Sequence, residues 1–423
     1  MLRRHEGRLG VGRGPGPHQV PCGERLPDYD VIVVGGRVAG ASTGMLLARQ
    51  GHRVLILERA SMPSDTVSTH AILRSGVLQL TRWGILDRIV EAGTPPIRDI
   101  TLGFGDERIE FQVRPDFDVD TLYAPRRHLL DQTLVEAAEE AGADFVDNTS
   151  VVGLTRDDCG RVNGVRIGRD TRSAELTAHW VIGADGHHSR VADQVGATMK
   201  RHHEATNTVH YAYFDGIDST RFWFQFTPGV NAGIIPTNDE QCLVFVGRPA
   251  HLRPHFTHDP DREFTRLVAG AGSDLADSLD AGRRAGKFRG TSGLAGFIRQ
   301  AWGPGWALVG DAGFTKDPIS AHGISDALRD AELCARAVDR SLRSPEQATE
   351  SMTTYETLRD SLSVRMFEES RQLARFEWTP EEASRRMRVV SEEVRRECDL
   401  LVSLPDWDDA GALVGAVAPR RAG

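Results

Sequence analysis

The chain has very little lysine, no closely paired cysteines and no long apolar run. Only Lys200, Lys287 and Lys316 are lysines among the 51 basic residues. The five cysteines are scattered without a Cys-x-x-Cys pair, which argues against a zinc site or a disulfide framework and predicts a reducing, cytoplasmic environment. No apolar run is long enough to span a bilayer, and no apolar segment follows Arg3 and Arg4 as a secretory signal requires.

The net charge of −9 argues against nucleic acid as a partner, because phosphate binding favours a strongly basic surface. A hydrophobic content of 40% is typical of a globular protein, and 423 residues are enough for two closely joined domains. Residues 1–27 carry several arginines, glycines and prolines without periodicity, so we expect a disordered tail there. A small molecule remains the expected partner, and the composition does not indicate an oligomeric state.

The stretch from residue 28 to residue 59 is typical of a dinucleotide-binding βαβ unit. Val31–Val34 is an apolar run that suits a strand buried on both faces of a parallel sheet. Gly35 and Gly36 allow a sharp turn, and Gly40 allows the following helix to pack close to the sheet. The first N–H groups of that helix, with the positive end of its dipole, are then available to an anion such as a pyrophosphate.

Two charged residues in this unit bear on that prediction. Glu58 ends a second apolar strand eighteen residues after Gly40 and is placed to accept hydrogen bonds from ribose hydroxyls. Arg37 stands where the fingerprint has its second glycine, so its side chain must turn aside or lie against the phosphates. The alternative is that the glycine turn serves helix–strand packing alone.

His70 follows a predicted helix start. Ser68 and Thr69 are candidate caps for a helix whose apolar positions recur between Ile72 and Leu80 at helical spacing. His70 is then either a histidine at the start of that helix or a residue beside the cofactor.

Arg127 stands in the first turn of a helix predicted from about Arg126 to Ala141. Leu130 and Leu134 follow at the spacing of an inward face. A helix start normally favours acidic side chains, so a cation there suggests an anionic ligand nearby. A surface pair of Arg126 and Arg127 is the alternative.

The later part of the chain changes character. Residues 208–246 are rich in aromatic strands, Trp223 among them, which predicts a mainly antiparallel sheet whose inner face walls a substrate pocket or merely fills a core. Residues 259–282 have a helical pattern and are expected to return toward the first domain. A strand at Trp306–Val309 is followed by a polar loop and by a helix after Gly323, whose N–H groups can meet an electron-rich ligand.

Three motifs now stand in one order along the chain. They are VVGGRVAG from Val33, with Glu58 behind it, GADGHHS at Gly183–Ser189, and GDAGFTKDPISAHGIS at Gly310–Ser325. Together they resemble the FAD-dependent monooxygenases of the aromatic-hydroxylase type, the para-hydroxybenzoate hydroxylase superfamily, over roughly residues 29–342. The resemblance implies FAD as the cofactor and NADH or NADPH as the reductant.

The resemblance also assigns residues to the parts of FAD. Glu58 and Arg59 fall with the glycines at the adenosine and pyrophosphate, Arg127 at the phosphates, and Asp311 at the ribitol chain. The loop and helix start around Gly323 fall beside the isoalloxazine ring, where N–H groups stabilise negative charge on the reduced flavin. The predicted cofactor-binding set is Gly35, Gly36, Arg37, Ala39, Gly40, Glu58, Arg59, Arg127, Asp185, Gly186, Asp311, Pro318, Gly323, Ile324 and Ser325.

The third motif departs from the family pattern and supplies the catalytic candidates. His322 replaces the usual glutamine, and Lys316 precedes Asp317 and the motif proline. Lys316 is therefore either a catalytic or substrate-contacting residue or the ion-pair partner of Asp317. His70, Lys316 and His322 are the candidate bases for a substrate hydroxyl, and no metal site is predicted.

The predicted fold is α/β. An FAD-binding Rossmann-like domain with a βαβ unit and a mostly parallel sheet is interleaved with a mainly antiparallel β-sheet substrate domain and a helical C-terminal part. The expected boundaries are 28–205 and 286–342 for the FAD-binding domain, which includes an inserted hairpin near residues 100–113. Residues 206–285 form the substrate domain, and residues 343–423 form the C-terminal helices.

The resemblance leaves several functions open. We expect an FAD-dependent, NAD(P)H-consuming monooxygenase that acts on an aromatic or polyketide-like small molecule. A reductase similar to geranylgeranyl reductase is the first alternative, and a non-catalytic flavoprotein is another. Flavin halogenases share the first motif, but the chain has no WxWxIP string, and RFWFQF is the nearest segment.

Overall fold

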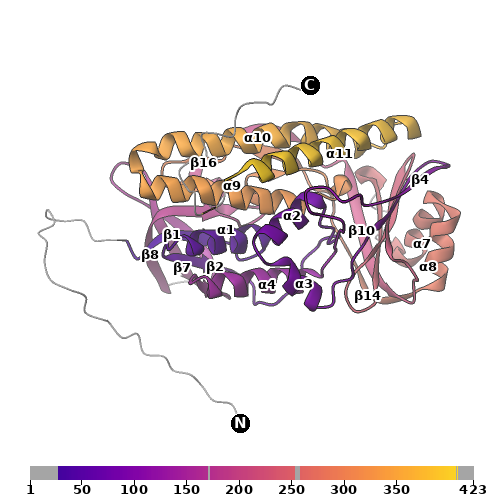
Figure 1. The fold of residues 1–423 in the computed structure, drawn as a ribbon, viewed down its shortest axis with the longest axis horizontal. Coiled ribbons are helices and arrows are strands. Elements are labelled where there is room, and N and C mark those ends of the chain that lie inside the picture. The colour runs from indigo at the N-terminus through magenta and orange to yellow at the C-terminus, as the bar shows by residue number, and fades with distance from the viewer. Residues whose placement is uncertain (1–26, 170–171, 253–257, 406, 408–423) are drawn as a thin grey trace, which may run out of the picture.

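The computed structural model describes residues 27–169, 172–252, 258–405 and 407 (Figure 1). Nearly all of the predicted tail of residues 1–27 lies outside the described residues. The sheet that contains β1 lies toward one end of the molecule, the sheet that contains β10 lies toward the other, and helix α10 runs along the long axis (Figure 1). The predicted mixed α/β fold is confirmed.

The first sheet has eight strands, and its centre is parallel. β1 (Tyr29–Val34) pairs in parallel with β2 (Val54–Leu57) on one side and with β8 (Arg172–Gly183) on the other. Every residue from Val31 to Val34 is buried, as expected for a strand that is covered on both faces. The remaining strands are β5 (Asp144–Val146), β6 (Val151–Arg156), β7 (Val162–Arg169), β16 (Trp302–Gly303) and β17 (Trp306–Leu308).

Different elements cover the two faces of this sheet. Val31 and Val33 belong to the core that includes helix α1 (Val38–Arg49) and helix α9 (Gly323–Arg343). Ile32 and Val34 face the other way, into a core formed with β6, β7 and α5 (Arg190–Val195). The alternation of a β-strand therefore explains why one apolar run supplies two cores.

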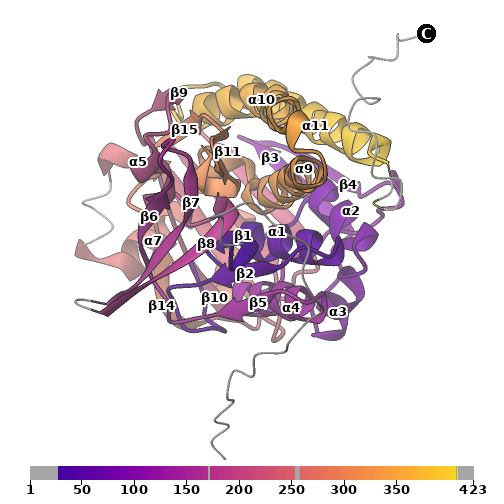
Figure 2. The same cartoon turned by 90° about the vertical axis from the view of Figure 1, so that its left-hand side faces the viewer.

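The C-terminal helices form a layer over α9. α9 packs against both α1 and α10 (Ala348–Leu373), and α11 (Pro380–Ser403) packs on α10 and on α2 (Arg74–Arg82) (Figure 2). None of the described helices has both the length and the apolar composition needed to cross a membrane. On the opposite side of α1 lies α4 (Arg127–Glu140), with α3 (Leu86–Glu91) beside it.

The second sheet has seven strands in the order β14-β10-β13-β12-β11-β3-β4. The hairpin expected within the first domain belongs instead to this sheet, because β3 pairs in parallel with β11 over residues 99–104. We therefore propose that the second domain includes this hairpin and all of β14. The bounds are β3 (Asp99–Phe104), β4 (Glu107–Gln112), β10 (Asn207–Asp215), β11 (Arg221–Thr227), β12 (Val230–Pro236), β13 (Cys242–Pro249) and β14 (Arg283–Gly290).

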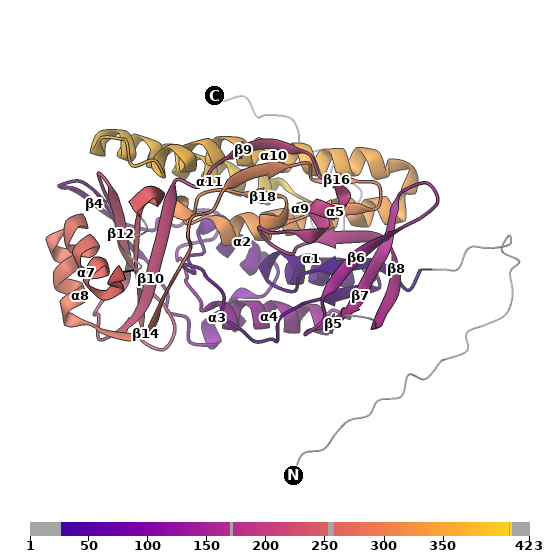
Figure 3. The ribbon, with the colours of Figure 1, turned by 180° about the vertical axis from the view of Figure 1, so that it is seen from behind.

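Helices α7 (Pro260–Ala271) and α8 (Ser273–Ala281) cover the outer face of this sheet (Figure 3). Phe264 and Leu267 of α7 share a core with Ile234 of β12 and Val244 of β13. The expectation that residues 259–282 return toward the first domain is therefore wrong, because their apolar face packs against the second sheet.

A small third sheet links the two domains near the third sequence motif. Its strands are β9 (Met199–His203), β15 (Gly296–Arg299) and β18 (Phe314–Thr315). Short 3-10 helices complete the chain: η1 (Ala250–Leu252), η2 (Gly310–Ala312), η3 (Pro318–Ser320) and η4 (Pro345–Gln347). Two of them, η2 and η3, flank β18 and hold the motif against the start of α9.

The helix predicted to begin at Ser68 or Thr69 begins instead at Arg74. His70 has a φ of 66°, in the left-handed region that a right-handed helix cannot contain. The chain at Ile72 then forms an isolated bridge with Tyr123 before the helix starts. Residues 66–71 therefore form a loop with neither helix nor strand, which changes what His70 can contact.

Candidate functional site

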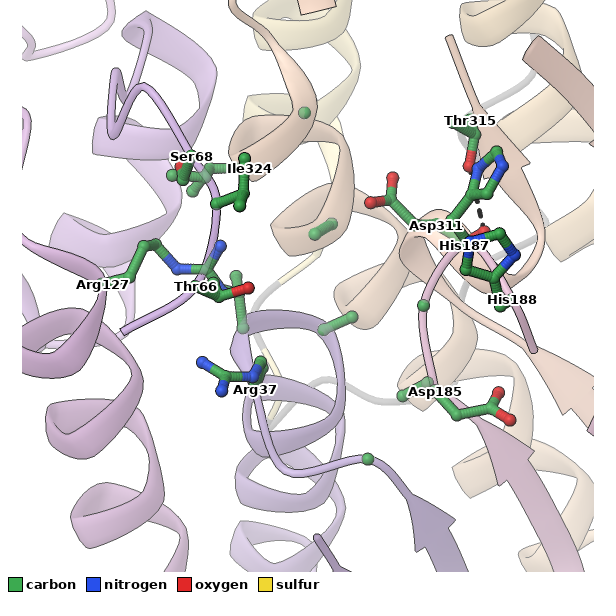
Figure 4. Close-up of a pocket in the computed structure, with 18 of the residues that line it drawn as sticks. Arg37, Thr66, Ser68, Arg127, Asp185, His187, His188, Asp311, Thr315 and Ile324 are labelled. Carbon is green, nitrogen blue, oxygen red and sulfur yellow. Dashed lines mark hydrogen bonds between the residues drawn. The ribbon is translucent and has the colours of Figure 1, made fainter. Parts of the chain in front are cut away.

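A cavity of about 460 Å³ is enclosed mainly by four separate segments of the chain, and residues 57–59, Arg127 and residues 149–151 also line it (Figure 4). The glycine turn and the start of α1 form one wall, and the loop of residues 66–71 forms a second. The turn at residues 184–188 and the third motif at residues 311–327 form the others. The cavity therefore lies at the carboxyl ends of β1 and β8, where ligands of open α/β sheets bind.

The glycine turn brings the backbone close to this cavity. Gly35 has a φ of 107°, and a Cβ there would lie 2.3 Å from the carbonyl oxygen of Ala184. A Cβ on Gly40 would lie 1.8 Å from the carbonyl oxygen of Gly35. Arg37 is the N-cap of α1 and makes no side-chain capping bond, so the first N–H groups of the helix stay free for a ligand.

Two arginines at this end of the cavity share one buried carboxylate. Nη1 of Arg37 lies 2.8 Å from Oδ2 of Asp131, and Nη2 of Arg127 lies 2.9 Å from its Oδ1. Asp131 is fully buried. One negative charge against two guanidinium groups leaves a net positive charge beside the glycine turn, which suits a pyrophosphate.

Arg126 takes a separate position, so the predicted surface pair with Arg127 is wrong. Its guanidinium forms an ion pair of 3.0 Å with Asp65 and stacks over the Tyr213 ring at 3.8 Å. The side chains of Arg126 and Arg127 are only 13% and 12% exposed. Asp65 also lies 3.3 Å from Arg289, so these cations are held inside the protein by acids that sequence reasoning did not identify.

Glu58 is buried, and its carboxylate accepts hydrogen bonds from backbone N–H groups of the glycine turn and of the loop after β2. Its Oε2 accepts a 2.8 Å hydrogen bond from the N–H of Gly36, and its Oε1 accepts one of 2.9 Å from Ala60. Each carboxylate oxygen retains a further lone pair for an outside donor such as a ribose hydroxyl. Arg59, the next residue, is exposed at the edge of the cavity.

The carboxylate of Asp185 accepts hydrogen bonds from nearby residues at the start of α5. Its carboxylate accepts hydrogen bonds from the hydroxyl of Ser189 at 2.5 Å, from the N–H of Arg190 at 2.7 Å and from that of Val191 at 3.2 Å. It therefore caps α5, and Gly186 continues the cavity wall. His187 lies beside it against Phe297, where burial lowers the pKa of the imidazole to about 4.

The third motif places a second helix start at the same cavity. α9 begins at Gly323 without a side-chain cap, and a Cβ on Gly323 would meet no atom within 4 Å. Ile324 and Pro318 line the cavity nearby, whereas Ser325 is fully buried beneath them. Asp311 also lines the cavity and is exposed to it.

The predicted ion pair between Lys316 and Asp317 is wrong. The carboxylate of Asp317 instead accepts hydrogen bonds of 3.0 Å from the Asn207 side chain and from the N–H of Ile319. Burial raises the pKa of Asp317 to about 6. Lys316 turns the other way and forms its ion pair with Asp326, in the first turn of α9.

Behind Lys316 lies a buried network of charges between α9 and α11. Arg329 donates to Asp326 at 2.8 Å and to Glu397 at 3.1 Å, and His322 lies 3.3 Å from Glu397. His322, Asp326 and Glu397 each bring one potential metal-ligand atom within 4.8 Å of the others. Because the guanidinium of Arg329 already bonds to both carboxylates, we interpret the group as an ion-pair network with its cation in place.

His70 lies in the wall of the cavity, and the helix-start alternative is wrong. Its Nε2 is 2.5 Å from the hydroxyl of Tyr213, and the two rings stack with centroids 5.8 Å apart. Its Nδ1 is buried without a hydrogen-bond partner among the described residues. Burial, followed by the charge of Arg127, lowers the pKa of His70 to about 3, so the ring is neutral near neutral pH.

Sequence reasoning missed the acids that hold these groups. Asp131 follows Arg127 by four residues, which is the spacing of an ion pair on one helix face and was a usable signal. Asp65 and Asp326 carried no comparable signal before the fold was known. Tyr213 is one of many aromatic residues in the predicted strands, so the sequence pattern did not predict its contact with His70.

Comparison with known proteins bears on this geometry. Residues 28–370 match the family described as FAD binding domain. The chain is 28% identical to the menaquinone reductase of Mycolicibacterium smegmatis, over 82% of this chain and 83% of that protein. It is 27% identical to the 6-methylpretetramide 4-monooxygenase of Streptomyces rimosus, over 71% of this chain and 73% of that protein.

Solved structures share the fold at lower identity. A probable FAD-dependent monooxygenase from Pseudomonas aeruginosa, pqsL, matches with a TM-score of 0.74 and 20% identity over 86% of this chain and 99% of that one. The flavin-dependent halogenase CmlS matches with a TM-score of 0.72 and 20% identity over 81% of this chain, which spans 63% of the halogenase. The chain likewise spans 66% of the conditioned medium factor receptor 1 of Dictyostelium discoideum, at 24% identity over 78% of this chain.

Proposed function

The chain belongs to the FAD binding domain family of FAD-dependent oxidoreductases, and on that basis we propose that it is a monooxygenase. The proposed reaction uses NADH or NADPH and molecular oxygen to hydroxylate an aromatic or polyketide-like small molecule. The observation that carries the proposal is a cavity with two uncapped helix starts in its wall, α1 with Arg37 and Arg127 nearby, and α9 with Ile324 in its first turn. This arrangement suits a dinucleotide whose pyrophosphate lies at the start of α1 and whose flavin ring lies at the start of α9.

The residues at the cavity fit FAD. Arg37 and Arg127 would hold the pyrophosphate, Glu58 the ribose, and Asp311 the ribitol chain. The open space beside Gly323 would admit the edge of a flat ring. FAD, when bound, supplies the electron-transfer and oxygen chemistry of the reaction.

The protein side chains would then orient the substrate and manage protons. His70 is neutral and fully buried, and its Nε2 contacts the hydroxyl of Tyr213, so it supports the cavity wall rather than meeting the substrate directly. A pKa of about 3 makes it a weak general base at neutral pH, so we assign it a positioning role. Lys316, whose pKa burial lowers to about 7, is better matched to proton transfer.

A flavin-dependent reductase of the geranylgeranyl-reductase type is the second candidate. It is favoured by the likeness to menaquinone reductase, which covers more of this chain than the likeness to the monooxygenase does. Such a reductase adds hydrogen to its substrate and needs no oxygen. A non-catalytic flavoprotein is the third candidate, and it would bind FAD that no nicotinamide donor reduces.

The halogenase alternative gains no support from the aromatic strand. Trp223 in the RFWFQF segment packs toward the α7 and α8 side of the second sheet, with Arg108 at 4.8 Å over its ring. Phe222 and Phe224, which alternate with it, face the main core. The likeness to the solved halogenase CmlS, at 20% identity, is one of fold.

The test starts from FAD-loaded protein under anaerobic conditions. NADH and NADPH are each added with a panel of phenols and prenylated quinones, and flavin bleaching at 450 nm is followed before labelled oxygen is admitted. Substrate-dependent bleaching and one labelled oxygen atom in the product support the monooxygenase. A product that gains two hydrogens without oxygen supports the reductase, and a flavin that neither donor bleaches overturns both.

A further inference from the structure

Lys316 is the one buried lysine among the three in this chain. Its side chain is 4% exposed, against 37% for Lys200, and Lys287 is exposed on β14. Lys316 also lines the cavity, together with Asp326, its ion-pair partner. An amine that is both buried and next to a ligand cavity responds to charge that appears in that cavity.

Groups from several elements face this amine. Asp326, Arg329 and Asp330 come from α9, Glu397 comes from α11, and Asp311 comes from η2. The ring of Phe314 on β18 lies 5.2 Å away, and His322 at the N-cap of α9 lies within the same network. Lys316 and its partner Asp326 are thus the residues through which the buried network reaches the cavity.

The carboxylates of this network outnumber its guanidinium group. Arg329 offsets one of the three carboxylates of Asp326, Asp330 and Glu397, and burial lowers the pKa of His322 so that it stays neutral. The proton on Lys316 is therefore the adjustable charge. Burial, and next the repulsion of Arg329, lower the pKa of Lys316 to about 7, so its amine and ammonium forms have similar populations near neutral pH.

We propose that Lys316 is a redox-linked proton site, which gains one proton when a flavin in this cavity is reduced and releases it when the flavin is reoxidised. The inference rests on the proposed FAD site. Two electrons and one proton give the reduced flavin its negative charge, and a second proton from solvent converts the Lys316 amine into ammonium. The electrons come from a nicotinamide donor in the proposed function and from dithionite in the test.

The physical basis is linkage between two charges in one low-dielectric site. Negative charge in the cavity stabilises the ammonium form of Lys316, and the ammonium in turn stabilises the reduced flavin by the same free energy. Between the two midpoints of Lys316 titration, reduction therefore takes up one proton more than the flavin alone requires.

The scarcity of lysine gives a direct readout. Protein labelled with ¹³C at lysine Cε carries three signals, and Lys200→Arg and Lys287→Arg identify two of them, so Lys316 is assigned without altering it. In FAD-loaded oxidised protein we expect the Lys316 signal to titrate near pH 7. After anaerobic reduction with dithionite, its midpoint should rise by at least one pH unit.

An equal midpoint in both redox states, or a Lys316 signal that does not titrate between pH 5 and 9.5, overturns the inference. Either result leaves the FAD site standing, because the flavin is seen to bind by its own absorbance. Protein that binds no FAD overturns the proposed function, and the inference falls with it.

Variants provide a second measurement through the slope of the flavin potential against pH. Wild-type protein should take up one more proton per two electrons than Lys316→Met does, and Lys287→Met should match wild type. Lys316→Arg keeps a permanent charge, so it should lose the extra proton but retain the higher potential. Equal proton numbers in wild type and Lys316→Met overturn the inference.

Discussion

The carboxylate of Asp131 lies 2.8 Å from the guanidinium of Arg37, although 94 residues separate them in the chain. Arg37 also donates to the carbonyl oxygen of Ser64 at 3.1 Å. These bonds turn the bulky side chain away from the path that the missing second glycine normally leaves open. They also keep its charge at the glycine turn, so an apparent defect in the motif becomes part of the candidate phosphate site.

Replacing Arg37 with alanine should weaken FAD binding about tenfold, or about 1.4 kcal/mol, because one charged contact to the pyrophosphate is lost. The measurement is the dissociation constant from quenching of flavin fluorescence. Arg166→Ala is the matched control, since Arg166 pairs with Glu175 on an exposed hairpin. Unchanged affinity in Arg37→Ala would remove this residue from the site.

Glu58→Gln should lower FAD affinity by a similar factor of about ten. The amide group would keep one acceptor oxygen, but its NH₂ would face either the N–H of Gly36 or that of Ala60, both of which now donate to Glu58. Binding of FAD and of FMN should be compared, because FMN lacks the adenosine ribose. A Glu58 role at that ribose predicts a loss for FAD and little change for FMN.

Two glycine substitutions should separate folding from binding. Gly40→Ala places a methyl group 1.8 Å from the Gly35 carbonyl oxygen, so it should destabilise the protein by about 2 kcal/mol or more and abolish FAD binding. Gly323→Ala meets no atom within 4 Å and should leave the thermal unfolding of FAD-free protein unchanged or slightly raised.

The same Gly323→Ala variant should bind FAD less tightly, because its methyl group enters the space proposed for the flavin ring. Unfolding temperature and FAD affinity are measured on both variants. Normal FAD affinity in Gly323→Ala would argue that the ring does not reach the start of α9.

The buried neutral His70 should make the protein sensitive to acid. Below about pH 6.5 an unfolded histidine binds a proton, whereas folded His70 stays neutral down to about pH 3. Stability contributed by His70 is therefore present above pH 6.5 and is lost as the pH falls, by up to about 1.4 kcal/mol per pH unit.

His70→Asn should flatten this dependence, because asparagine tolerates the positive φ and does not titrate. Urea unfolding at pH 7 and pH 5 gives the comparison, and His202→Asn on exposed β9 is the control. An equally steep loss in wild type and His70→Asn would mean that other groups cause the acid sensitivity.

Short-range features of the chain were predictable from sequence. The apolar runs at residues 31–34 and 54–57 form buried parallel strands, and the helix predicted from about Arg126 to Ala141 spans Arg127–Glu140. The order of three motifs also identified the family. These features depend on local apolar patterns and on glycine turns, which a few neighbouring residues determine.

The tertiary structure alone decided which partner each chemical group has. A strand pattern shows which face is buried but does not identify the neighbouring strand, so the pairing of β3 with β11 could not be predicted from sequence. Lys316 likewise forms its ion pair with Asp326 and not with the adjacent Asp317. The turn at η3 and the start of α9 bring the Asp326 carboxylate to the buried amine. Charge partners in a core depend on how distant elements pack, which local sequence does not encode.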